Sequence, residues 1–152
     1  MIGQDINEDK NNKIMYIGKY PEKQVDLLTA CNMYDVGSSM YLGKDDNFKI
    51  RGKLYAEGLT VYHSGSTKFL LENKYSELTF NIGHIDGTDS SDDFSLKFVV
   101  DGQEVETFSL NENVDIDNTV TVPLNYGKIM EMEWFGSKSY SGSYGLINLN
   151  VK

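Results

Sequence analysis

The chain has 152 residues, of which 39% are hydrophobic and two are proline, and this composition predicts one packed domain rather than a disordered tail. The formal net charge of −9 repels phosphate backbones and argues against a nucleic-acid partner. The single cysteine, Cys31, rules out an internal disulfide bond. No window reaches the roughly 18 apolar residues that a transmembrane helix needs.

Residues 1–24 form a polar lead-in in which residues 14–17 fit a first short strand. Residues 25–152 are predicted to be a single domain. The opening MIGQDINEDKNNK is polar and acidic, unlike a signal peptide. We therefore expect either a protein that stays inside the cell or a piece of a larger chain whose export signal lies elsewhere.

Short apolar runs separated by turn residues fill the rest of the chain. In residues 76–82, Leu78, Phe80 and Ile82 alternate with polar side chains, which is typical of a strand with one buried face. The same alternation recurs in Phe94–Val100. Residues 21–29 fit a helical turn with Val25 and Leu28 on the core. Further strands are predicted at residues 33–36, 40–42, 48–50, 58–63, 67–71, 103–110, 119–124, 128–134 and 144–151.

A hairpin is predicted where Asp101 and Gly102 separate two of these runs, because a type I′ turn needs positive φ at both positions. On the returning run, Val105 and Phe108 are three residues apart, so we expect a β-bulge there. Two sets are predicted to share one face of a strand: Met130, Met132 and Trp134, and Ile147, Leu149 and Val151.

No segment of a dozen residues has a convincing helical period. Many short strands separated by Gly, Asp, Asn and Ser turns are typical of antiparallel sandwiches. The predicted fold is therefore all-β, an antiparallel β-sandwich of the jelly-roll type.

Three segments in order resemble the NPCBM family, which includes carbohydrate-binding module family 51. They read GKLYAEGLTVYH at 52–63, YSELTFNIG at 75–83 and LKFVVDGQEV at 96–105, with an Asp-rich loop between the second and the third. The resemblance covers roughly residues 25–152. It implies a galactose-binding-like β-sandwich with a non-catalytic role, appended to bacterial secreted or cell-surface proteins. It also implies galactose-containing glycans as ligands and, in related sandwiches, a structural calcium ion.

The end of the chain departs from the family pattern. Many members end with an acid and a tryptophan near the ligand, whereas residues 143–150 read SYGLINLN. This departure leaves a second interpretation open, namely a structural or protein-interaction sandwich without a sugar site.

A sugar site needs an aromatic side chain against the C–H face of the ring and polar groups for the hydroxyls. Two regions offer both: residues 134–144, which alternate aromatic with small polar residues, and residues 32–35 together with Tyr41. His63 falls at the family's histidine position, where a structural role competes with a sugar contact. Trp134 ends an alternating strand and also fits the core. The candidate ligand-binding residues are Tyr140, Tyr144, Tyr34, Asn32, His63 and Trp134.

The acidic loop 86–93 is the candidate calcium site, through Asp86, Asp89 and Asp92, because calcium prefers clustered oxygen ligands. A solvated loop is the alternative, and His84 beside it fits a solvated turn. A catalytic centre is not expected, since the chain offers no nucleophile with an adjacent base. Glu131 and Glu133 share a strand face but are expected to be solvated.

Overall fold

The computed structural model describes residues 23–37, 39–42, 48–89, 94–136 and 142–152, and its regular elements are short strands and one helical turn. The expected lead-in strand at residues 14–17 lies outside the described residues. The strands are β1 (Val25–Asp26), β2 (Met33–Tyr34), β3 (Met40–Leu42), β4 (Phe48–Ile50), β5 (Lys53–Tyr55), β6 (Leu59–Val61), β7 (Ser64–Leu70), β8 (Glu77–His84), β9 (Phe94–Val100), β10 (Gln103–Leu110), β11 (Thr119–Pro123), β12 (Ile129–Gly136) and β13 (Tyr144–Val151).

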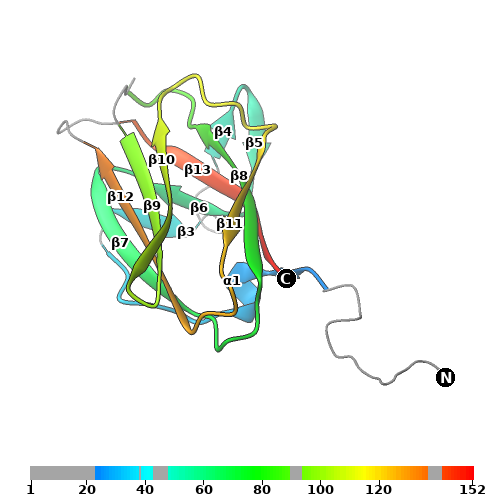
Figure 1. Cartoon of the computed structure of the whole chain (residues 1–152). Coiled ribbons are helices and arrows are strands. Elements are labelled where there is room, and N and C mark those ends of the chain that lie inside the picture. Colours follow the sequence, from blue (N-terminus) through cyan, green and yellow to red (C-terminus); the bar gives the residue numbers. More distant parts are fainter. Residues whose placement is uncertain (1–22, 38, 43–47, 90–93, 137–141) are drawn as a thin grey trace.

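Two antiparallel sheets face each other and confirm the predicted β-sandwich (Figure 1). The first, which we call the front sheet, has the order β10-β9-β12-β7-β2. The second, the back sheet, has the order β11-β8-β13-β6-β3, with β1 added to β13. The alternating residues of β8 and β9 bury Phe80 and Phe98 between the sheets, with ring centroids 5.6 Å apart. The sandwich is therefore held by the inward faces that the sequence alternation predicts.

The hairpin between β9 and β10 has the predicted turn, with φ of 50° at Asp101 and 81° at Gly102. The register of β10 against β9 shifts between Glu104 and Glu106, which confirms the expected bulge at Val105. A carboxylate oxygen of Asp101 accepts the backbone N–H of Ile129 at 3.0 Å. The turn is thus fixed to the start of β12, the strand at the centre of the front sheet.

β13 differs from the prediction that Ile147, Leu149 and Val151 share one face. The pairing of β13 with β8 is irregular between Ile147 and Asn150, and Asn148 has φ of 53°. This bulge reverses the alternation, so that Leu149 and Val151 enter the main core while Ile147 lies in a second cluster. The prediction is wrong for Ile147 because period two does not continue across a bulge.

The second cluster lies on the outer side of the back sheet, beneath the hairpin of β4 and β5, and consists of Phe48, Ile50, Ile85, Ile116 and Ile147. Gly83 of β8 and Gly145 of β13 are register partners, and neither carries a side chain that would fill this space. A Cβ atom at Gly145 would lie 2.8 Å from Cζ of Phe48, and one at Gly83 would lie 2.8 Å from Cγ2 of Ile50. The glycine pair therefore makes the seat for the hairpin, whose second strand the sequence alone did not predict.

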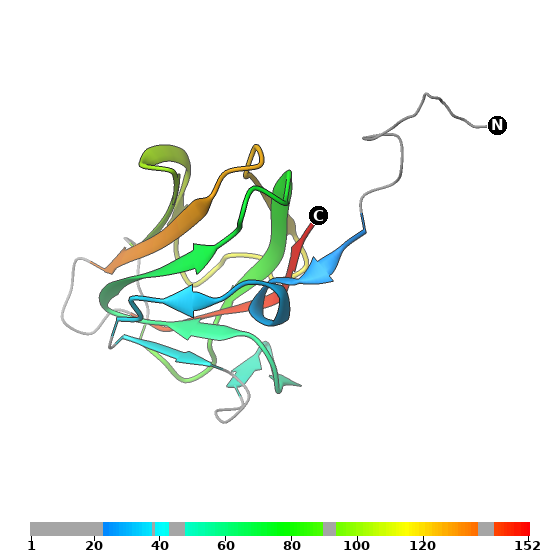
Figure 2. The same ribbon diagram turned by 90° about the horizontal axis from the view of Figure 1, so that it is seen from below.

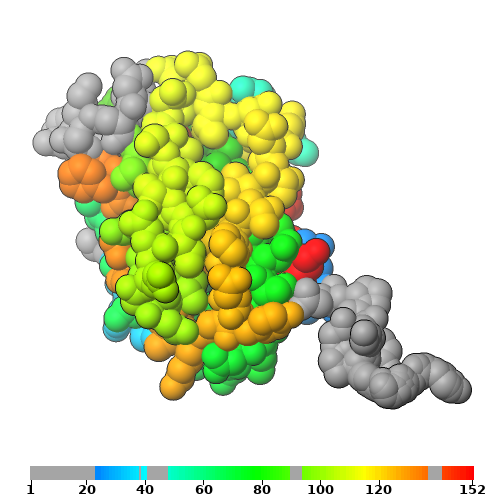
Figure 3. All heavy atoms as spheres, viewed as in Figure 1, coloured from blue at the N-terminus to red at the C-terminus, as the bar shows by residue number. Residues whose placement is uncertain are grey.

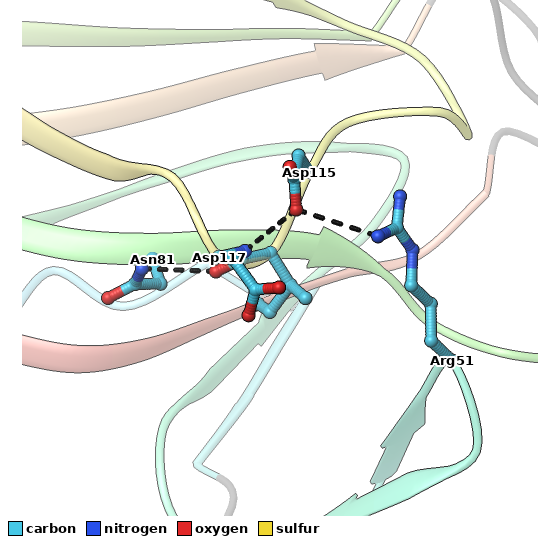
Figure 4. A network of polar contacts seen from close by, with 5 residues as sticks. Arg51, Asn81, Asp115 and Asp117 are labelled. Carbon is cyan, nitrogen blue, oxygen red and sulfur yellow. Dashed lines mark hydrogen bonds and ion pairs between the residues drawn. The ribbon is translucent and has the colours of Figure 1, made fainter.

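The segment that joins β10 to β11 is tied to the same side of the molecule (Figure 4). Arg51 lies 3.5 Å from the carboxylate of Asp115, and the Asn81 side chain donates to the carbonyl of Ile116 at 3.0 Å. Asp115 also accepts the backbone N–H of Asp117 at 3.0 Å. These contacts place Ile116 in the second cluster.

The helical turn α1 (Leu27–Ala30) begins at Asp26, whose side chain accepts the N–H of Thr29 at 2.9 Å. An acidic N-cap satisfies a backbone donor that the first turn leaves free. Leu27 is the buried residue of this turn, while Leu28 is only partly buried against the core. Figure 2 shows α1 beside β13, so the start of the described chain covers the end of the back sheet.

Candidate functional site

Two of the aromatic residues predicted to contact a ligand are core residues. Tyr144 has no exposed surface, and its ring centroid lies 4.6 Å from that of Phe94. Trp134 is 2% exposed, and its indole N–H donates to the carbonyl of Tyr62 at 3.0 Å. Both side chains point inward from their strands, so the prediction that they contact a ligand is corrected for these two residues.

His63 lies exposed in the turn between β6 and β7, with φ of 53°. Its carbonyl accepts the N–H of Gly136 at 2.8 Å, and its ring packs edge-on against Tyr62. Asn32 is exposed and Tyr34 is partly exposed beside β7, where Tyr34 pairs with Lys68. All three remain candidates for ligand contact. Tyr140 lies outside the described residues, as do Asp92 and the side chain of Tyr41.

Asp86 is used in the fold. Its two carboxylate oxygens accept the backbone N–H groups of Arg51 and Gly52, at 2.9 and 2.8 Å, and so fix the turn between β4 and β5. Asp89 is exposed. Among the described residues no group of three His, Cys, Asp or Glu side chains is arranged to hold a metal ion. Calcium binding by this loop stays a prediction.

His84 is not a solvated turn residue. It is the last residue of β8 and is partly buried, and its Nε2 lies 2.8 Å from the carbonyl of Asp89 and 3.1 Å from Oγ1 of Thr88. The same hydroxyl accepts the N–H of Ser143 at 3.2 Å. These contacts join the segment after β8 to the start of β13 at one end of the sandwich.

The structure adds a candidate site that the sequence analysis did not identify, on the outer face of the front sheet. Here a hollow of about 640 Å³ lies over parts of β7, β12, β9 and β10. Its volume lies within the range of ligand pockets in proteins. Its lining includes Ser64, Ser66, Ser95, Lys97, Glu133 and Phe135.

Phe135 provides the aromatic surface of the hollow. It is 57% exposed, although most large apolar side chains of the described chain are buried. Its register partners are Ser64 on one side and Ser95 on the other. Because both neighbours are short, the phenyl ring stands above a floor of hydroxyl groups.

Polar groups flank this ring. Glu133 lies two residues before Phe135 on the same face of β12. Its neighbours across the strands are Ser66 of β7 and Lys97 of β9. The Lys97 ammonium lies 3.4 Å from a carboxylate oxygen of Glu133, and both side chains are partly exposed. The hollow therefore combines an apolar ring with hydroxyl, ammonium and carboxylate groups, which is what recognition of a polyhydroxylated ring requires.

The sequence carried a signal for this face. Glu131, Glu133 and Phe135 alternate with the buried Met130, Met132 and Trp134, so Phe135 had to point outward from the strand. The predicted region 134–144 contains Phe135, but its aromatic candidates were Tyr140, Tyr144 and Trp134 rather than this exposed ring.

A second cavity, of about 330 Å³, lies between β10 and β11 and is lined mainly by apolar side chains that include Phe80, Phe108, Leu110 and Val120. Figure 3 shows these two strands side by side, with the segment that joins them crossing above. Its polar lining residues are Thr107, Ser109, Asp115 and Asn118, and no exposed aromatic ring lies among its described lining residues. We regard the hollow around Phe135 as the candidate functional site.

No protein-family model and no curated protein sequence matches the chain. Solved structures do match, and they define its class of fold, which is the β-sandwich of carbohydrate-binding modules of family 51. The resemblance expected from the sequence is thus confirmed at the level of the fold. Within the described residues no helix has the length and apolar character to cross a membrane.

Three of these structures are informative. The family 51 module from Clostridium perfringens GH95, solved with methyl-galactose, matches at a TM-score of 0.59 and 15% identity over 86% of this chain and 100% of its own. The second module and INT domains of Clostridium perfringens ZmpB match at 0.62 and 13%, over 85% of this chain. Tandem modules of Streptococcus pneumoniae Sp3GH98 match at 0.61 and 16%, over 99% of this chain and 51% of theirs. This chain spans only 31% of the ZmpB chain.

Proposed function

We propose that this chain is a non-catalytic glycan-binding module of a larger bacterial secreted or cell-surface protein, and that galactose-containing glycans bind in the hollow around Phe135. The observation that carries the proposal is the exposed phenyl ring of Phe135 between two serines on the outer face of the front sheet. The fold of the chain supports it, since the compared structures with this fold are carbohydrate-binding modules.

The absence of an assembled nucleophile and base among the residues of the hollow supports a binding role over catalysis. Glu133 is engaged by Lys97, and the hydroxyl groups nearby belong to serines on neighbouring strands with no histidine lining the hollow. Binding would place a partner domain of the larger protein near its glycan.

The experiment is a glycan array followed by calorimetric titration of the purified chain with the best glycan. Phe135→Ala removes the ring and is expected to weaken binding by a factor of about 5–30, corresponding to roughly 1–2 kcal/mol. Leu54→Ala is the matched control, because Leu54 is equally exposed, at 56%, but lies on β5 away from the hollow. Equal affinities for Phe135→Ala and the unchanged chain would reject the hollow as the site.

The alternative, a protein-interaction sandwich, requires an exposed apolar edge. The large exposed apolar residues of the described chain are Val36, Leu54, Tyr126 and Phe135. They come from four separate segments, and none lies on β2, β10 or β11, which are edge strands of the two large sheets; Leu54 lies on β5 of the two-stranded sheet. This distribution favours the binding module. A blank glycan array together with self-association in sedimentation would favour the alternative.

A further inference from the structure

The hollow extends across four strands of the front sheet, β7, β12, β9 and β10. Four of its lining residues form one row in the register: Ser66 of β7 opposite Glu133 of β12, Glu133 opposite Lys97 of β9, and Lys97 opposite Thr107 of β10. Three interstrand steps separate the ends of this row, a length of about 14 Å, since neighbouring strands lie about 4.8 Å apart. That length exceeds one pyranose ring.

The residues at both ends of this row have short side chains. Ser66 and Thr107 have short side chains, and neither can close the hollow. The residue next to Ser66 on the outer side of β7 is Gly37, whose backbone N–H donates to the Ser66 carbonyl at 3.0 Å. Glycine has no side chain that could close this end. Beyond Thr107 the sheet ends, because β10 is its edge strand. A ligand can therefore enter at one end and leave at the other.

Two further side chains stand beside this row. Phe135 lies on one side of Glu133, and Glu131 lies on the other side, both on the same face of β12. A trough that is open at both ends fits a chain that passes along it, whereas a terminal sugar is normally held in a pocket closed at one end.

The charge of the trough selects among such chains. Its described ionisable groups are Lys97, Glu131 and Glu133, one cation and two anions, which gives a formal net charge of −1. The one cation is already paired with Glu133 at 3.4 Å. The whole chain carries −9. Sulfated, sialylated or uronate-containing glycans would be repelled.

We infer that the hollow binds an internal stretch of an uncharged polysaccharide, lying across the strands from Ser66 to Thr107, rather than a single terminal sugar. This inference rests on the proposed function and names its class of ligand. The ring of Phe135 would cover one sugar, and the Glu133–Lys97 pair would bond hydroxyl groups of the next.

The test is a titration series with unbranched β-1,4-linked galacto-oligosaccharides of one to six units and the parent galactan. Affinity is expected to rise by about tenfold or more from galactose to the tetrasaccharide and then to level off. Oligosaccharides whose terminal sugar is chemically blocked are expected to bind as well as unblocked ones. Equal affinity for galactose and the hexasaccharide, or loss of binding on blocking the terminal sugar, would overturn the inference and leave the proposed function intact.

Two variants close the ends of the trough, Ser66→Tyr and Thr107→Tyr, with Leu54→Ala as the control. Each tyrosine is expected to reduce the gain from chain length while leaving the thermal unfolding of the chain unchanged. If neither tyrosine changes the affinity for the galactan, the inference is also overturned. If neither these oligosaccharides nor any glycan of a broad array binds the folded chain, the proposed function itself fails.

Discussion

Phe135 of β12 lies directly opposite Ser64 of β7 on the outer face of the front sheet. Side chains that face each other in this way are the closest neighbours across two strands. A serine leaves the phenyl ring uncovered, and this pairing produces the exposure of 57%. In the proposed function, glycan binding would therefore depend on the small residues beside the ring as much as on the ring itself.

Covering the ring from the opposite strand is therefore expected to weaken glycan binding while the ring itself stays in place. In Ser64→Tyr the new side chain can pack on Phe135, and we expect the affinity for the array-selected glycan to fall by about tenfold. Stability should change by less than about 0.5 kcal/mol, because the site is on the surface. Calorimetry and urea unfolding measure the two effects. Unchanged glycan affinity would show that the ring does not contact the ligand.

Gly145 is expected to tolerate no side chain, because the ring of Phe48 lies over it. Gly145→Ala should lower the free energy of unfolding by about 1–3 kcal/mol through overpacking. Adding Phe48→Leu should recover part of this loss, a coupling that a double-mutant cycle detects. Glycan affinity should be unchanged, since this seat lies on the back sheet. Additive losses in the double variant would contradict the proposed packing.

Asp101 is expected to make the stability of the chain depend on pH. Hydrogen bonds from the backbone N–H groups of Lys128 and Ile129 lower the pKa of its carboxyl group. Its contribution is therefore present at neutral pH and is lost as the pH falls below about 4, the ordinary range of an aspartate.

Asp101→Asn tests this, because asparagine keeps the positive φ of the turn but not the charge. The variant should be less stable than the unchanged chain at pH 7, and the difference should shrink as the pH approaches 2. Urea unfolding across this range measures both. A difference independent of pH would assign the effect to the turn rather than to the charge.

Cys31 is expected to be unreactive in the folded chain. It is 4% exposed, and burial raises the pKa of its thiol, although a hydrogen bond with Tyr75 opposes this. The reactive thiolate is therefore scarce at neutral pH. Labelling by a maleimide should be slow in buffer and should rise with urea along the unfolding transition measured by fluorescence. Rapid labelling before that transition would show that the end of α1 opens on its own.

The sequence predicts the parts of this fold where local rules apply without interruption. Alternation locates β8 and β9, and Asp101-Gly102 locates the turn, whose two positive φ angles are confirmed. The prediction fails where a single residue interrupts the alternation of inward and outward side chains. Asn148 adopts positive φ and reverses the faces of β13, and nothing in the composition of that strand announces the bulge.

The candidate site was less predictable for a different reason. Tyr144 satisfies every local criterion for a binding residue, yet it follows the inward alternation of β13 and packs on Phe94. Phe135 becomes a site only because Ser64 and Ser95 come to lie beside it from strands far away in the sequence. Which side chains meet across a sheet depends on register, and register is a property of the whole fold.

The most direct test of the hollow is a backbone amide NMR titration of the intact chain with the best array-selected glycan. The account predicts that chemical-shift changes concentrate at Ser64, Ser66, Ser95, Lys97 and Phe135 on the front sheet. Changes confined to Thr88, Asp89 and Ser143, at the end of the sandwich where two loops meet, would contradict it and assign glycan binding to those loops.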